Sequence, residues 1–364
     1  MPRDLPDLCP ARDRPLTADV VTSRTWMLVR SDRGLLGRHA RLLPSGHVGG
    51  CVADEVRRWE VIDGHLVFLD AVGRRMVVFA EAEVADDGMM MLQGAVRGAE
   101  GAIYLLRERD ALSRIADDAG DIQVMRSAVM ASGSAGPRRN LVVLRANEHS
   151  LHNGWKRDIA GEDRNWDLCV SFYGKEENFP PADFAEYQVL QNRDQKFASI
   201  HKLMYRGNPF WDYAYFMFPD DDLMMSWSGI NRLFETTRSF GLHLAQPALL
   251  PEGFVYHPIV AQNPAFRVRF TNFVEIMTPI FSRCALEICI PTFADSPRGF
   301  GLDFVWPSQL GDRPGRIAII DEVGVLHGRP LGGNYDVAHG NQERIKVMDD
   351  YGCSWNIQQR GAIV

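Results

Sequence analysis

Hydrophobic and polar positions follow two different patterns in two parts of this chain. In the first part, short apolar runs are separated by turn signals, as at Asp63-Gly64 between Trp59–Ile62 and His65–Leu69. An Asp-Gly pair between two such runs is a strong hairpin signal. Further runs follow at 76–80, 89–92 and 103–106. This regular spacing predicts a small antiparallel β domain, a sandwich or a barrel, over residues 22–110.

Farther along the chain, apolar runs alternate with stretches of helical periodicity. The expected strands are Leu141–Leu144, Leu168–Phe172 and Tyr213–Phe218, and the expected helices are Gln195–Tyr205 and one beginning near Trp227. Such alternation predicts an α/β domain with a mixed, mainly parallel sheet that carries helices on both faces.

These patterns divide the chain into five segments. Residues 111–137 begin acidic and end in small residues, which is typical of a flexible connection. We expect a tail at 1–21, the β domain at 22–110, a linker at 111–137, a catalytic α/β domain at 138–336 and an extension at 337–364. The β domain shows no catalytic constellation, and we assign it a role in positioning an acceptor glycan.

Composition narrows the functional classes. The 364 residues carry a net charge of -7 with a pI near 5.8, so a broad nucleic-acid-binding surface is not expected. Residues 1–15 lack the apolar core of a signal peptide, and no stretch approaches the ~20 apolar residues of a membrane span. The six cysteines lack paired spacing and are expected to be reduced. We expect a cytoplasmic protein, a location compatible with peripheral contact at the inner face of the cell membrane.

The most informative stretch is the acidic run Asp220-Asp221-Asp222, which directly follows an apolar strand. Such clustered carboxylates repel one another unless positive charge lies among them. Asp-x-Asp at a strand end suits Mn²⁺ or Mg²⁺, which share carboxylate oxygens with the phosphates of a substrate. The alternative is a solvated turn or helix start, where Asp is also favoured. We favour a site for a nucleoside diphosphate-sugar.

Two other positions are ambiguous when each is taken alone, and become functional candidates only together with other site residues. Asp303 follows Gly299-Phe300-Gly301, at the start of a predicted helix, and is either a general base or an ordinary helix-terminal carboxylate. His327 follows an apolar strand and is either a metal ligand or a structural histidine.

Basic and aromatic residues supply candidate donor contacts. Lys196, Lys202 and Arg206 lie on or just beyond one predicted helix and would neutralise a diphosphate, although a solvated helix face fits equally well. The rings of Trp155, Trp211 and Trp306 would stack on a base or a sugar, against core packing as the default.

The carboxy-terminal two-thirds, from about residue 140 to 333, resembles the family catalogued as domain of unknown function 707, which is similar to GT-A glycosyltransferases. The resemblance rests on six blocks in one order: Trp166–Gly174, Phe218–Leu223, Leu244–Leu249, Asn272–Arg283, Gly299–Phe304 and Val325–His327. The family often has Asp-Glu-Asp-Leu at Asp220–Leu223, and Trp at the position of Phe300. Both departures leave the outer carboxylates and Asp303 in place.

The resemblance implies an inverting, metal-dependent glycosyltransferase. The expected donor is a nucleotide-sugar, with UDP-sugar favoured, and the expected acceptor is a glycan or a lipid-linked hydroxyl compound. The implied metal ligands are Asp220, Asp222 and His327, and the implied base is Asp303. The donor contacts would be Arg145, Asn147, Lys196, Lys202, Asp220 and Asp221, and the acceptor or sugar contacts would be Gln246, Glu275 and Trp306.

Two other functions stay open. An inactive glycan-binding or scaffold protein would keep the acidic run as a remnant. A sugar nucleotidyltransferase also arranges carboxylates and a metal around phosphates. It ranks third because no Gly-rich phosphate loop follows the first strand of the α/β domain.

Overall fold

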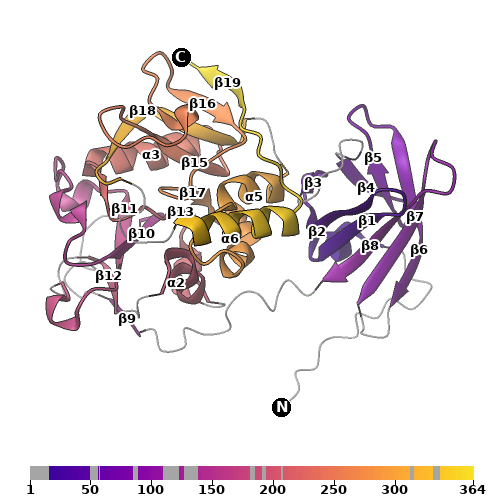
Figure 1. The fold of residues 1–364 in the computed structure, drawn as a ribbon, viewed down its shortest axis with the longest axis horizontal. Coiled ribbons are helices and arrows are strands. Elements are labelled where there is room, and N and C mark those ends of the chain that lie inside the picture. The colour runs from indigo at the N-terminus through magenta and orange to yellow at the C-terminus, as the bar shows by residue number, and fades with distance from the viewer. Residues whose placement is uncertain are drawn as a thin grey trace. The chain divides into compact units, whose positions relative to one another are not determined.

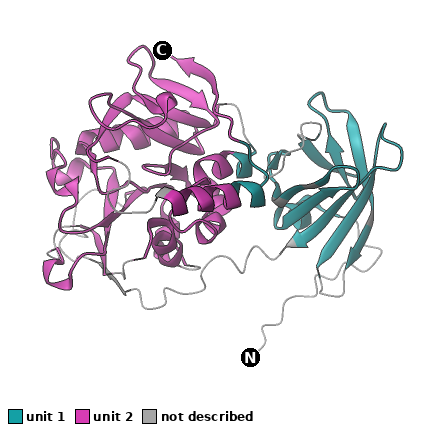
Figure 2. Cartoon of the chain, in the orientation of Figure 1, with its two compact units in different colours: residues 1–112, 308–311, 348–354 teal, residues 113–307, 312–347, 355–364 magenta. Residues whose placement is uncertain are grey.

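The computed structural model of the chain contains two compact units, which are coloured separately in Figure 2. The first comprises residues 1–112, 308–311 and 348–354, and the second comprises residues 113–307, 312–347 and 355–364. The structure describes residues 16–49, 56, 58–84, 89–109, 123–126, 138–180, 185–190, 194–205, 208–311, 315–330 and 337–364.

The first unit is an eight-stranded antiparallel sheet that closes on itself (Figure 1). Its strands are β1 (Thr25–Arg30), β2 (Gly34–Leu42), β3 (Val48–Gly49), β4 (Arg58–Ile62), β5 (His65–Leu69), β6 (Arg75–Val84), β7 (Met90–Val96) and β8 (Ile103–Arg109). Each strand pairs with its neighbour in sequence, and β8 returns to β1. A bridge between His47 and Arg58 joins the β3 and β4 ends, so the unit is an up-and-down barrel.

Local sequence explains the barrel's tightest turn. Asp63 and Gly64 connect β4 to β5 with φ values of 51° and 79°, and Ile62 pairs with His65. A two-residue hairpin of this kind needs positive φ at both positions, and Asp-Gly is well suited to it. The predicted hairpin is confirmed.

Side chains fill the barrel interior. Trp26, Phe68, Phe79 and Tyr104 are almost completely buried there, and the rings of Phe68 and Phe79 meet edge to face at 4.8 Å. Eight strands enclose a space just wide enough for such packing. The interior is therefore a packed core.

The second unit is built on an eleven-stranded sheet (Figure 1). Its strands are β9 (Gln123–Arg126), β10 (Asn140–Ala146), β11 (Trp166–Phe172), β12 (Tyr187–Leu190), β13 (Tyr215–Met217), β14 (Leu223–Met224), β15 (Leu244–Leu249), β16 (Val268–Thr271), β17 (Ile280–Ser282), β18 (Ile317–His327) and β19 (Gln359–Ile363). Every residue of β10 and β15 is buried, so the centre of the sheet is covered on both faces.

Strand direction corrects one expectation. β10, β11, β12 and β13 pair in parallel, as do β15 and β18, but β9, β16, β17 and β19 are antiparallel to their neighbours. The sheet is thus mixed but not mainly parallel. The physical reason is that short antiparallel segments, such as the three-residue β17, insert between the parallel groups.

Helices follow the strands of this unit: α2 (Lys196–Leu203), α3 (Trp227–Ser239), α4 (Arg283–Cys289), α5 (Leu302–Gln309) and α6 (Val337–Asp350). The hydroxyl of Ser226 caps α3 by accepting from the backbone N–H of Gly229 at 3.0 Å. No helix in the described ranges is long and apolar enough to cross a membrane.

Strand β18 contains a register shift. Pro247 of β15 pairs with Ile320, but the next residue, Ala248, pairs with Gly324, so residues 321–323 are extra on the β18 side. Within this insertion, Asp321 accepts two hydrogen bonds of 2.8 Å from the buried guanidinium of Arg269. A bidentate, buried ion pair therefore holds the extra residues.

Three expected segment boundaries differ from the structure. Ala18–Thr22 forms helix α1 with Val21 fully buried, so the expected tail at 1–21 ends earlier. The expected linker contains β9, which pairs with β12, while 110–122 and 127–137 lie outside the described residues. In the expected extension, β19 pairs with β16 and belongs to the main sheet.

Candidate active site

The candidate site lies where strands of the second sheet end. β13 and β15 are both antiparallel to β17, and β18 is parallel to β15, so β13, β15 and β18 run in one direction with β10 to β12. We call the edge at which these strands end the carboxyl edge, and the opposite one the amino edge. In open α/β sheets, ligands bind at the carboxyl edge.

The acidic run and His327 meet at this edge, although 105 residues separate Asp222 from His327. The short strand β14 follows the run and pairs Leu223 with His327. This pairing places His327 Nε2 at 3.3 Å from Asp222 Oδ2, while His327 Nδ1 lies 2.9 Å from the carbonyl of Phe254. Burial lowers the pKa of His327, but its bond to Asp222 and that carboxylate's charge outweigh burial and raise it.

One carboxylate oxygen of Asp222 is available to a ligand. Its Oδ1 is buried and has no hydrogen-bond partner among the described residues. An unpartnered buried carboxylate oxygen costs free energy unless a ligand occupies the position beside it. Asp222 is therefore the member of the acidic run best suited to bind a cation.

Asp220 is already paired with a positive charge. Lys196 Nζ lies 2.6 Å from Asp220 Oδ1 and also donates to the carbonyls of Ile276 (2.7 Å) and Met277 (3.2 Å). An ammonium has three donors, and these contacts use all of them. The expectation that Lys196 binds a diphosphate is thus not supported by this geometry, because its donors hold Asp220 and the 276–277 backbone.

Asp221 is a structural member of the site. Its Oδ2 accepts hydrogen bonds from Ser150 Oγ at 2.6 Å and from the Tyr173 hydroxyl at 3.0 Å. The same hydroxyl accepts from Asn147 Nδ2 at 2.8 Å, and the guanidinium of Arg145 lies 4.9 Å from the Tyr173 ring centroid. The structure brings the expected Arg145, Asn147 and Asp221 together through two residues that sequence reasoning missed.

The sequence could have identified Tyr173 as a candidate site residue, because it is the first polar residue after the buried strand β11. Ser150 offered no such indication, because its contact with Asp221 spans 71 residues.

Asp303 and Glu275 form a second pair of carboxyls in this unit. Both are at least nine-tenths buried, and one oxygen of each, Asp303 Oδ1 and Glu275 Oε2, lacks a hydrogen-bond partner among the described residues. Burial raises the pKa of Asp303 to about 7. Burial, together with the nearby charge of Asp303, raises the pKa of Glu275 to about 8. Two neighbouring groups with such values are typical of acid–base sites.

Two expected contacts are wrong as assigned, and a third stays a prediction. Gln246 is fully buried, and its side-chain oxygen accepts from the Glu275 backbone N–H at 2.5 Å, so it positions Glu275. Trp306 is also fully buried, in an aromatic cluster where it donates to Thr292, and it presents no face to a sugar. Lys202 pairs with Asp194 on an exposed surface, and its expected contact with the donor stays a prediction.

The expected three-ligand metal set is not formed. Among the described residues, no group of three His, Cys, Asp or Glu side chains has the geometry to hold a metal ion. Asp222 and His327 are adjacent, whereas Asp220 is occupied by Lys196. Arg206, the other basic candidate, lies outside the described residues.

No protein-family model matches the chain, and no curated protein matches it. Among solved structures, S. aureus TarS 1-349 aligns with a TM-score of 0.35 and 10% identity over 58% of this chain and 71% of that chain. The same protein in complex with UDP-GlcNAc aligns with a TM-score of 0.32 and 8% identity, over 58% and 72% of the two chains. Alignments with TM-scores this low do not establish a shared fold or function.

Proposed function

We propose that this protein transfers a glycosyl group from a nucleoside diphosphate-sugar to a hydroxyl acceptor. The observation that carries the proposal is the meeting of Asp222 and His327 at the carboxyl edge, with Asp222 Oδ1 buried and unpartnered. A carboxylate and an imidazole beside an open position are a common ligand pair for a divalent cation. The resemblance to GT-A glycosyltransferases, which the six sequence blocks imply, supports the choice of donor.

The donor set fits a cation only with help from the substrate. Asp222 and His327 supply two ligands, and Mn²⁺ or Mg²⁺ bound by one or two protein groups takes further oxygens from substrate phosphates and water. When bound there, such an ion would offset the negative charge that develops on a diphosphate leaving group. Lys196 keeps the neighbouring Asp220 neutralised, which limits repulsion between Asp220 and the incoming diphosphate.

The proposed base is Asp303. With a pKa of about 7, a large fraction of this carboxyl is ionised at neutral pH and can take the proton of an acceptor hydroxyl. Glu275, with a pKa of about 8, is mostly protonated at the same pH and can donate a hydrogen bond. We propose an inverting transfer, in which the hydroxyl attacks the sugar carbon opposite the departing diphosphate while Asp303 holds the released proton.

The test is binding of UDP by calorimetry, with and without Mn²⁺, to wild type and to Asp222→Asn. The variant should lose at least roughly tenfold in Mn²⁺-dependent affinity, because a neutral amide replaces the negative charge of the Asp222 carboxylate. Asp212→Asn, an exposed aspartate at the amino edge, is the matched control and should bind as wild type does. Unchanged Mn²⁺-dependent affinity in Asp222→Asn would refute the metal assignment.

A further inference from the structure

Among the Phe, Tyr and Trp residues that the structure describes, the exposed ones lie in one part of the second unit. Among the described residues, only Phe254, Tyr256 and Trp355 are aromatic and exposed, with 40%, 38% and 54% of their surface open to solvent. Single exposed apolar residues are ordinary, but a group of them beside a functional site marks a binding surface. All three rings contact residues of, or next to, the candidate active site.

Phe254 and Tyr256 flank His327. Their ring centroids lie 6.2 Å and 6.0 Å from that of His327, and the Phe254 carbonyl contacts His327 Nδ1. The next residue in this loop, His257, lies 3.9 Å from Glu275 Oε1. The loop 254–257 therefore reaches from the proposed cation ligands to the buried carboxyl pair.

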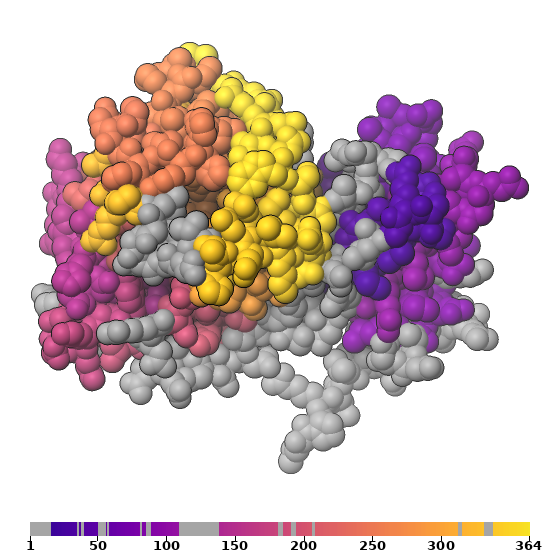
Figure 3. Space-filling model, viewed as in Figure 1, coloured from indigo at the N-terminus to yellow at the C-terminus, as the bar shows by residue number. Residues whose placement is uncertain are grey.

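Trp355 lies beside His257 and Phe304, next to the loop 254–257. Its ring centroid lies 4.7 Å from Phe304, the neighbour of Asp303, and 6.0 Å from His257. The guanidinium of Arg344 lies 4.7 Å from the Trp355 ring and adds a polar group beside it. In the space-filling view, the carboxy-terminal segment, coloured yellow, adjoins an earlier segment of the second unit, coloured orange (Figure 3).

The backbone that follows Trp355 is held in place. Asn272 donates from Nδ2 to the Asn356 carbonyl at 2.7 Å and accepts from the Gln358 N–H at 2.7 Å. Thr271 Oγ1 donates to the Gln358 carbonyl at 3.0 Å. An exposed ring on a fixed backbone loses little conformational entropy when a ligand packs against it.

We propose that Phe254, Tyr256 and Trp355 form an aromatic platform that binds the sugar rings of a glycan acceptor beside Asp303 and Glu275. A pyranose has an apolar C–H face that packs on an aromatic ring and hydroxyls that need hydrogen-bond partners. The platform supplies the rings, and the guanidinium of Arg344 beside Trp355 supplies a hydrogen-bond partner. The acceptor role rests on the proposed function, whereas glycan binding by the platform does not.

The test uses a defined panel of probes: hexasaccharides of glucose, mannose and N-acetylglucosamine, each titrated by calorimetry without donor. At least one should bind the wild type, and Trp355→Ala should weaken it roughly tenfold, the effect of losing one aromatic packing contact. Trp355→Phe should restore affinity to within about threefold, since it keeps a ring. Ile345→Ala, at an exposed apolar residue on α6, is the matched control and should bind as wild type does.

The readouts separate the two proposals. UDP binding in the presence of Mn²⁺ should be unaffected by Trp355→Ala, because the ring contacts neither Asp222 nor His327 in the structure. If wild type binds a hexasaccharide through Trp355 but binds no UDP, the platform stands and the transferase function fails. If no hexasaccharide binds, or if Trp355→Ala and Ile345→Ala behave alike, the platform is refuted.

Discussion

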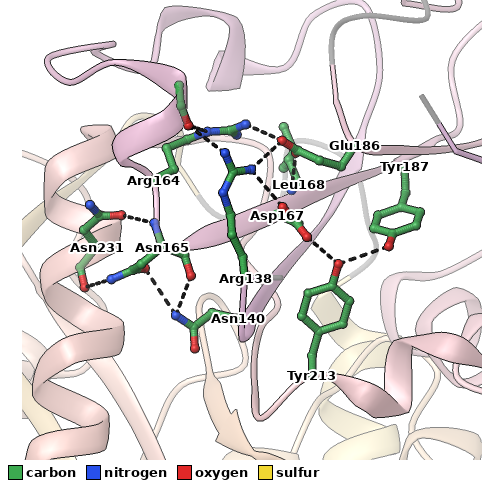
Figure 4. A network of polar contacts seen from close by, with 11 residues as sticks. Arg138, Asn140, Arg164, Asn165, Asp167, Leu168, Glu186, Tyr187, Tyr213 and Asn231 are labelled. Atoms are coloured by element: carbon green, nitrogen blue, oxygen red, sulfur yellow. Dashed lines mark hydrogen bonds and ion pairs between the residues drawn. The ribbon is translucent and has the colours of Figure 1, made fainter. Parts of the chain in front are cut away.

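The two edges of the second unit's sheet differ in whether their buried charged groups have partners. At the amino edge, Arg138 lies 2.8 Å from both Asp167 and Glu186, and Arg164 also pairs with Glu186 (Figure 4). At the carboxyl edge, Asp222 keeps a buried oxygen without a partner, as does Glu275 in the loop that leads to β17. One edge satisfies its charges internally, and the other keeps buried carboxylate oxygens without a partner among the described residues.

The amino-edge network explains how three parallel strands are held together where they begin. Glu186, just before β12, also accepts from the Leu168 N–H of β11 at 2.8 Å, and Tyr213, just before β13, donates to Asp167 at 2.5 Å. A buried network is favourable only when every member is satisfied.

A cavity of about 430 Å³ also lies at this edge, with Arg139 and Tyr215 in its wall, away from the acidic run. The comparison teaches that buried carboxylate oxygens without a partner, and not this cavity, mark the edge at which we propose that a ligand binds.

The largest effect is expected from the carboxyl edge, in catalysis. Asp303→Asn should lower kcat by roughly 10²–10⁴, because the amide cannot take a proton from the acceptor. Its free energy of unfolding above pH 7 should stay the same or rise, since the substitution removes a buried negative charge. Turnover assays and urea unfolding check both. A variant that turns over normally would mean that another group is the base.

The next effect is expected from the amino edge, in stability. Glu186→Ala should lower the free energy of unfolding by about 3–5 kcal/mol, because Arg138 and Arg164 lose a buried partner that they share. Glu177→Ala, which breaks an exposed pair with Lys175, is the control and should stay within about 0.5 kcal/mol of wild type. Equal losses in urea unfolding would contradict the contrast between buried and exposed pairs.

A further effect should appear in the pH dependence of stability. The pKa values of Asp303 and Glu275 are raised in the folded state, to about 7 and about 8. The folded protein then binds more protons than the unfolded chain between about pH 4 and 8, so stability falls as pH rises through this window, at up to about 1.4 kcal/mol per pH unit for each proton. The double variant Asp303→Asn, Glu275→Gln should lose this slope in urea unfolding at pH 5, 6.5 and 8. A variant that keeps the full slope would exclude these two carboxyls as its source.

The smallest effect distinguishes two lysines of one helix. Lys202→Met should change stability by less than about 1 kcal/mol and UDP affinity by less than about twofold, because its pair with Asp194 is exposed. Lys196→Met should weaken UDP binding more, since it leaves Asp220 without its positive partner beside the diphosphate. Similar affinities in the two variants would show that Asp220 does not need Lys196.

Sequence patterns predicted the elements that local chemistry decides. The Asp63-Gly64 hairpin, a helix within 195–205 and the position of the acidic run after a buried strand are all confirmed. Each depends on residues that are neighbours in the chain, where turn preference and periodicity act directly.

The site itself was only partly predictable, because its decisive contacts are long-range. Lys196 was placed near the acidic run, but the carbonyls that take its other donors lie 80 and 81 residues away. The sequence also does not reveal which tryptophans are buried: Trp306 lies in the core and Trp355 is exposed. The sheet was expected to be mixed, but its share of antiparallel strands was underestimated because three- to five-residue strands such as β16, β17 and β19 leave a weak periodic pattern.

The three extra residues in β18 act as a spacer for the active site. They lie between the part of β18 that pairs with β15 at Ile320 and the part that ends at His327. Side chains alternate between the two faces of a strand, so deleting one residue of this spacer would turn His327 to the opposite face of the sheet, away from Asp222. Natural variants of this chain should therefore keep the length of 321–323 unchanged, and they should also keep Asp321, which pairs with the buried Arg269.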